Sequence, residues 1–262
     1  MFLLTILFFI LGLTIGSFLN VVVARYNTSR SLRGRSACMS CRNQLCWYEL
    51  IPLFSFLGLR GRCLNCKTKI SKYYPTVELI TGVIFAGIFL KFQDIFFLDI
   101  SAFAVTYGYY AILFSLLVVI ASYDLKHKII PDLFSGLLFA ISFIGLFIFD
   151  PFVYGISIGW PEISELFSGA LVALPFVLFW LFSRGAWMGL GDAKLALGLG
   201  YMLGLGRALS AVVMSFWIGA IVGIFLMVIK NQKIKSEIPF APFLVLGTAL
   251  AFFFELYLFP VF

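Results

Sequence analysis

Long apolar runs separated by short polar segments dominate this chain. The runs predict helices over residues 2–24, 75–90, 100–123, 132–149, 164–182, 192–205, 208–229 and 239–259. Most of them have the length and composition of helices that cross a bilayer. We therefore expect an all-α polytopic membrane protein with about eight transmembrane helices.

The one sizeable polar segment, residues 25–75, sets the expected topology. It contains ten Lys or Arg residues and a single acid, Glu49. Because short loops rich in Lys and Arg stay in the cytoplasm, this segment should be cytoplasmic. An even number of helices then places both termini on the outer side. The chain thus divides into a first transmembrane helix at 1–24, a cytoplasmic loop domain at 25–75 and a transmembrane domain at 76–262.

Composition narrows the classes of function. The chain is 62% hydrophobic and only 12% charged, whereas soluble domains carry about 25% charged residues. The net charge of +7 resides in loops, where the positive-inside rule accounts for it, so we expect a lipid bilayer and no nucleic acid as partner. A single histidine and the lack of a Gly-x-Ser-x-Gly motif leave little room for a serine triad.

Two Cys-x-x-Cys pairs lie in the cytoplasmic loop. They are Cys38 with Cys41 and Cys63 with Cys66, with 21 residues between the pairs. This spacing is typical of a ribbon or knuckle that holds a tetrahedral zinc ion through four thiolates. Two disulfides are an alternative that the reducing cytoplasm opposes, and a redox role is another. The fifth cysteine, Cys46, is expected to be a small buried residue.

Two aspartates are the candidate catalytic groups. Asp192 ends the motif Gly189-Leu-Gly191-Asp192 between apolar runs, and Asp124 follows the third predicted helix. A carboxylate at the edge of the hydrocarbon layer is costly unless it is paired or used, and the topology places both on one side. A carboxyl pair can hydrolyse a peptide, with one member taking a proton from water and the other donating to the carbonyl oxygen. Helix-end dipoles favour Asp192 as the ionised member, and the glycines would let an extended substrate backbone approach.

Several other residues carry weaker expectations. Gly12 and Gly16 indicate close packing of the first helix, and the amide of Asn20 near its end needs a partner. Glu78 suits the positive end of the second helix, and a catalytic or ligand role is the alternative. Asp132 follows Pro131 and is expected to cap the fourth helix.

Together these motifs resemble the prepilin peptidase family, also called type IV leader peptidases, which are Gly-x-Gly-Asp membrane aspartic proteases. The matching stretches are residues 16–22 with Arg25, the four paired cysteines, 59–63, 73–78, 124–132, 189–194 and 238–243. The chain departs from the family pattern at Met39, where proline is frequent, and at Ala241, where glycine is expected.

The resemblance implies a bacterial inner-membrane enzyme with two activities. As an aspartic endopeptidase it would remove the leader of type IV prepilins or type II secretion pseudopilins on the cytoplasmic side. It would also N-methylate the new N-terminus with S-adenosylmethionine, although no Gly-rich loop of a soluble methyltransferase is present. Carried over by position, the catalytic pair is Asp124 and Asp192.

The resemblance also assigns the three parts of the chain. The zinc ligands are Cys38, Cys41, Cys63 and Cys66. Residues 25–75 would then form the zinc-binding domain and part of the methyltransferase, and residues 76–262 the transmembrane aspartic peptidase domain.

Two alternatives of other kinds stay open. A proton-coupled transporter could use two aspartates as a relay, but it predicts an internal repeat with broken helices, and none is visible. Another Gly-x-Gly-Asp intramembrane protease, such as a signal-peptide peptidase, would resemble only the two aspartate segments.

Overall fold

A computed structural model describes residues 1–28, 31, 34–149, 156, 158–186, 188–230 and 238–258. Within these residues the chain is helical, with a few isolated β-bridges and no strand, so the predicted all-α class is confirmed for them. The helices are α1 (Phe2–Arg25), α2 (Phe54–Gly58), α3 (Tyr73–Lys91), α4 (Gln93–Leu98), α5 (Ile100–His127), α6 (Asp132–Gly145), α7 (Ile163–Ser183), α8 (Leu190–Leu203), α9 (Leu205–Lys230) and α10 (Ala241–Phe254), with a 3-10 turn η1 (Trp47–Leu50).

Five helices of the described residues are long and apolar enough to cross a membrane, namely α1, α3, α5, α7 and α9. The predicted helices near 132, 192 and 239 correspond to α6, α8 and α10, which have 14 residues each. At a rise of about 1.5 Å per residue such a helix covers roughly 21 Å, less than the roughly 30 Å hydrocarbon core. The predicted end near 259 is wrong, because α10 ends at Phe254 with Glu255 in the left-handed conformation, and α5 runs to His127 rather than ending at 123.

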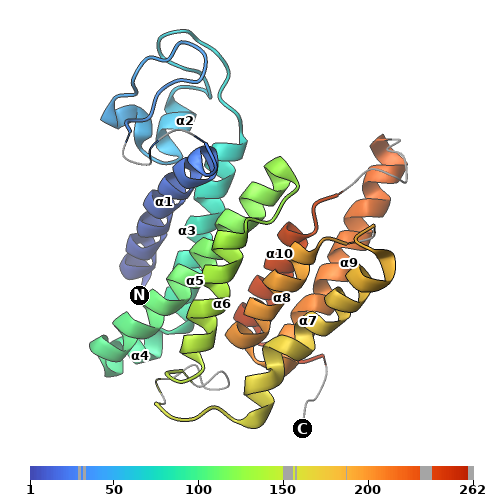
Figure 1. The fold of residues 1–262 in the computed structure, drawn as a ribbon. Helices are drawn as coiled ribbons and strands as arrows, with labels where there is room; N and C mark the ends of the chain where they lie inside the picture. Colours follow the sequence, from blue (N-terminus) through green and yellow to red (C-terminus); the bar gives the residue numbers. More distant parts are fainter. Residues whose placement is uncertain are drawn as a thin grey trace. The chain divides into compact units, whose positions relative to one another are not determined.

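The chain folds as two compact units, Met1–Asp94 and Ile95–Phe262. In the first unit α1 and α3 pack against each other along their length (Figure 1). A Cβ added at Gly16 would lie 2.8 Å from the Cα of Glu78, and one added at Gly12 would lie 2.7 Å from the carbonyl oxygen of Thr81. The expected close packing of Gly12 and Gly16 is therefore confirmed, because only a residue without a side chain permits this approach.

Helix α8 lies at the centre of the second unit, in contact with α6, α7, α9 and α10 (Figure 1). It crosses α7 where Gly200 meets Gly169, and the Ser168 hydroxyl donates to the Gly200 carbonyl oxygen at 3.1 Å. Most residues of α8 are apolar or small, on every side of the helix, and most of them are buried. A helix of this kind is covered by protein, which allows a short helix to carry a polar residue at its start.

Candidate active site and cysteine cluster

Asp124 lies in the last turn of α5. Its side chain is buried, with 5% of its surface exposed. The helix ends at His127 because Lys128 adopts a left-handed conformation (φ 55°) and donates its N–H to the Asp124 carbonyl oxygen at 2.7 Å. The carboxyl group is thus held at the polar end of a long apolar helix.

Asp192 lies in the first turn of α8, after the N-cap residue Gly189, and is also buried, with 8% exposed. Gly191 faces Ile130, because an added Cβ would lie 2.9 Å from the Ile130 Cβ. The second glycine of the motif therefore makes room for the chain that connects α5 to α6. Gly189 is exposed, so of the two glycines it is the one open to an approaching backbone.

The two carboxyl groups belong to the same compact unit and lie close enough for the Asp124 charge to act on Asp192. A third element reaches Asp124: the backbone N–H of Ala241, the first residue of α10, donates to its Oδ2 at 3.2 Å. Helix N-termini stabilise anions, so α10 supports a charge on Asp124 and opposes the effect of the α5 C-terminus. Whether Asp192 is the ionised member stays a prediction.

The contact from Ala241 is the part of this site that the sequence did not reveal. In the sequence, residues 238–243 stand out only as a match to the family pattern, with a departure at Ala241. The available signal was Pro242, since proline in a first turn marks a helix start, where free N–H groups point outward.

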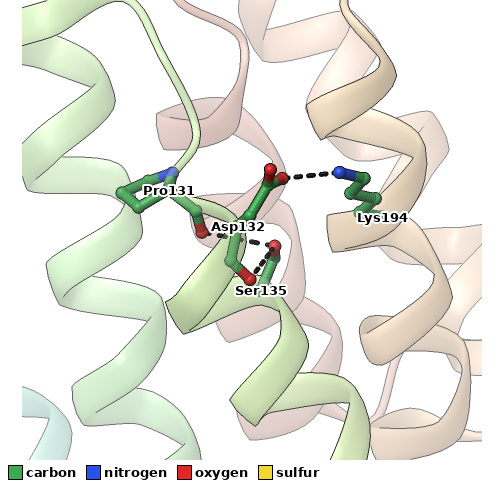
Figure 2. A network of polar contacts seen from close by, with 4 residues as sticks. All are labelled: Pro131, Asp132, Ser135 and Lys194. Atoms are coloured by element: carbon green, nitrogen blue, oxygen red, sulfur yellow. Dashed lines mark hydrogen bonds and ion pairs between the residues drawn. The ribbon is translucent and has the colours of Figure 1, made fainter.

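Asp132 does not cap α6 as expected. Pro131 occupies the N-cap position, and the Asp132 carboxylate instead forms an ion pair with the Lys194 Nζ at 2.6 Å (Figure 2). The Ser135 hydroxyl donates to the carbonyl oxygens of Pro131 and Asp132 at 3.3 and 3.2 Å. Lys194 follows Asp192 by two residues, so the ion pair connects the starts of α6 and α8.

The paired cysteines occupy two turns of the same geometry. In the first, Cys38 N–H donates to Asn43 O and Arg42 N–H donates to Cys38 O, both at 2.9 Å. In the second, 25 residues later, Cys63 N–H donates to Thr68 O and Lys67 N–H donates to Cys63 O, both at 3.0 Å. Each turn contains a basic residue in the left-handed region, Arg42 at φ 58° and Lys67 at φ 57°.

The structure brings the four paired cysteines together. Their Sγ atoms all lie within 4.8 Å of one another, and those of Cys38 and Cys66 are 3.7 Å apart. A tetrahedral zinc with Zn–S bonds of about 2.3 Å requires S–S separations of about 3.8 Å. No cysteine is in a disulfide. The cluster therefore has the donor set and spacing of a metal site.

The prediction for Cys46 is wrong. The residue is exposed and is the N-cap of η1, where its backbone N–H donates to Glu49 Oε2 at 2.8 Å. The sequence Cys-Trp-Tyr-Glu carries the signal, because an acid three residues after a cap is typical of a helix start.

Comparison with known proteins identifies the family of this chain. Residues 10–92 match the model of the bacterial peptidase A24 N-terminal domain, and residues 111–224 match that of the type IV leader peptidase family. A protein of Aeromonas hydrophila named prepilin leader peptidase/N-methyltransferase is 30% identical over 94% of this chain and 89% of its own length. The chain belongs to the type IV leader peptidase family. The recognition made from the motifs is therefore confirmed.

Other relatives have the same name. The Bacillus subtilis protein is 30% identical over 94% of this chain and 92% of its own length. The Myxococcus xanthus protein is 35% identical over 86% of this chain, and the chain spans 63% of that protein's length. No solved structure matches. The second family model covers both Asp124 and Asp192.

Proposed function

We propose that this chain is a membrane aspartic endopeptidase that removes the leader of type IV prepilins or type II secretion pseudopilins on the cytoplasmic side, and that it N-methylates the new N-terminus with S-adenosylmethionine. The observation that supports the peptidase is the pair of buried carboxyl groups, Asp124 and Asp192, which belong to one compact unit where the Asp124 charge acts on Asp192. Family membership and the relatives' names support the substrate class and the second activity.

The carboxyl pair supplies both halves of peptide hydrolysis. The ionised aspartate takes a proton from a water molecule as its oxygen attacks the scissile carbonyl carbon. The protonated aspartate donates to the carbonyl oxygen. The first then gives its proton to the leaving nitrogen as the C–N bond breaks, while the second regains a proton from a hydroxyl of the tetrahedral intermediate. Like charges close together in a buried site cannot both ionise cheaply, which keeps one proton on the pair. The Ala241 N–H holds Asp124 in place throughout.

Cys38, Cys41, Cys63 and Cys66 would hold the zinc ion, and their common Sγ separation supports this set. When bound, zinc would supply a structural cross-link between the two turns.

The location we propose is the bacterial inner membrane, with eight spans, both termini on the outer side and the active site near the cytoplasmic face. Five long apolar helices support a multi-pass arrangement. α6, α8 and α10 would be the remaining spans, and their 14-residue length fits helices packed against protein rather than lipid. The basic segment 25–75 supports the orientation.

The test is cleavage of a purified prepilin that carries its leader. Wild type, Asp124→Asn and Asp192→Asn are compared, with and without S-adenosylmethionine. Loss of a general acid or base should lower the cleavage rate by about 10²–10⁴-fold. Asp132→Asn is the matched control, because it removes an exposed carboxylate next to the same site, and it should change the rate by no more than a few-fold.

Cleavage at the wild-type rate by Asp124→Asn or Asp192→Asn would remove that residue from catalysis. A wild-type protein that leaves every prepilin leader intact would contradict the substrate class.

A further inference from the structure

The interface between α1 and α3 contains polar atoms that leader cleavage does not use. Asn20 on α1 is 6% exposed, and its Nδ2 donates to the Tyr74 carbonyl oxygen at 3.0 Å. Its Oδ1 is buried and has no partner among the described residues. An orphaned buried acceptor costs about 1–3 kcal/mol, so this atom calls for a donor.

Glu78 lies one turn further along the same interface. Tyr74 and Glu78 are four residues apart on α3, and Gly16 and Asn20 are four apart on α1, with Gly16 against the Glu78 Cα. Residues at this spacing share a helix face. Asn20 and Glu78 therefore lie on successive turns of the interface where α1 meets α3.

The Glu78 carboxylate is half-buried. It accepts hydrogen bonds from the Leu53 backbone N–H, at 2.9 Å, and from Ser17. No charged group among the described residues acts on it. A carboxylate has about four acceptor sites, so it retains capacity for further donors. An uncompensated acid within a membrane-spanning helix is expensive and marks a functional site.

The position of Leu53 shows that this arrangement is held in place. Leu53 adopts φ 58°, which non-glycine residues rarely do, and the Glu78 carboxylate receives its N–H. The chain between η1 and α2 is thereby fixed over the start of α3. Backbone strain of this kind persists where the surrounding contacts impose it, frequently at binding sites.

We infer that Asn20 and Glu78 form a binding site for an ammonium group. A primary ammonium carries a positive charge and three N–H donors and no acceptor. It would satisfy the orphaned Asn20 Oδ1 and neutralise Glu78 together. A neutral donor would satisfy the first without the second, and a ligand whose only charged group is a phosphate or carboxylate would be repelled.

The ligand follows from the proposed function, on which this inference rests. Both reactants of N-methylation carry an amino group that binds as an ammonium ion, namely the new N-terminus of the cleaved pilin, which loses a proton before it attacks the methyl group, and the amino-acid end of S-adenosylmethionine. The site lies in the unit Met1–Asp94, which the separate N-terminal family model covers, whereas the aspartate pair lies in the other unit. N-methylation in the N-terminal unit would account for a binding site in a different unit from the aspartate pair.

The test is equilibrium binding to the full-length protein in lipid nanodiscs. One pair of probes is S-adenosylhomocysteine and methylthioadenosine, which lacks the amino-acid end. The other pair is a mature pilin N-terminal peptide with a free amine and the same peptide acetylated. Glu78→Gln keeps an acceptor for Leu53 and removes the charge, and Asn20→Leu removes the orphaned oxygen. Glu49→Gln is the control, since Glu49 is the one acid of the loop 25–75 and its carboxylate accepts only a local hydrogen bond, from the Cys46 N–H at the start of η1.

Glu78→Gln should weaken binding of an ammonium-bearing probe at least tenfold, Asn20→Leu should weaken it several-fold, and both should leave the matching probe without ammonium unchanged. The pair that responds identifies the source of the ammonium. Unchanged binding of both ammonium-bearing probes would overturn the inference. Equal weakening of all four probes, or a large fall in the unfolding temperature with it, would make the role structural and would overturn it too.

Wild-type cleavage separates this inference from the proposed function. A protein that cleaves prepilin and binds neither ammonium-bearing probe refutes the ammonium site and leaves the peptidase standing. A protein that binds a probe through Glu78 and cleaves no prepilin refutes the peptidase instead.

Discussion

The crossing of α7 and α8 gives the sharpest prediction, through the change Gly200→Ala. A Cβ at Gly200 would lie 2.5 Å from the Gly169 Cα and 2.8 Å from the Ser168 carbonyl oxygen. Both obstacles are backbone atoms, so no side chain can rotate away. The helices must separate by roughly 1 Å, because ordinary carbon–carbon contacts are about 3.5–4.0 Å.

Overpacking of this kind costs about 1–3 kcal/mol. For a chain of this size 1 kcal/mol shifts the unfolding temperature by roughly 2–4 °C, so Gly200→Ala should lower it by roughly 2–12 °C. The same helix carries Asp192 in its first turn, and cleavage should fall as well. The measurement is thermal unfolding of detergent-solubilised protein at one scan rate, since unfolding of such proteins is commonly irreversible.

Gly108→Ala is the matched control. Gly108 lies inside α5, and nothing lies within 4 Å of an added Cβ. Alanine is favoured over glycine in helix interiors by about 1 kcal/mol, so this change should keep or raise the unfolding temperature. If Gly200→Ala were as stable as Gly108→Ala, the α7–α8 crossing described here would be wrong.

Three further predictions test other parts of the molecule. Cys63→Ser should lower the bound zinc well below the value of about one ion per chain expected for four thiolates, whereas Cys46→Ser, outside the cluster, should retain it. Metal analysis of the purified proteins measures this, and equal loss of zinc in both variants would contradict the ligand set. A double-mutant cycle with Asp132→Asn and Lys194→Gln should give a coupling energy of only about 0.2–1 kcal/mol, because both side chains are exposed, and a much larger value in thermal unfolding would show a tighter pair. Hydrogen bonds from the Ser101 hydroxyl and from backbone N–H groups lower the pKa of Asp99, the N-cap of α5. The stabilisation by the ionised Asp99 is complete above the unfolded-state pKa of about 4 and is lost as pH falls through the folded-state pKa. The difference in unfolding temperature between wild type and Asp99→Ala should therefore shrink at low pH, and a constant difference would refute the cap.

Much of this fold could be predicted from hydrophobic patterning. Each of the eight predicted helices corresponds to an observed one, because long apolar runs have few alternatives in a membrane. The lengths of α6 and α10 were less predictable. Their ends depend on contacts with neighbouring helices, and a run of Phe, Leu and Ile such as 143–149 remains apolar after the helix stops at Gly145.

In the candidate site, too, some features could be predicted from the sequence and others could not. Asp124 and Asp192 stand out in sequence because each acid interrupts an apolar environment. The donor to Asp124 is a backbone N–H, which every residue except proline carries, so the identity of Ala241 gave no chemical signal. The residues around Asp132 indicate the start of a helix and therefore predict a cap. They give no sign of its partner Lys194, which is 62 residues away.

The two cysteine turns share one hydrogen-bond pattern at an offset of 25 residues, and each contributes half of a four-sulfur shell. Neither turn alone can complete the coordination of a metal ion. A metal ion should therefore bind with full affinity only after both turns of the loop have folded.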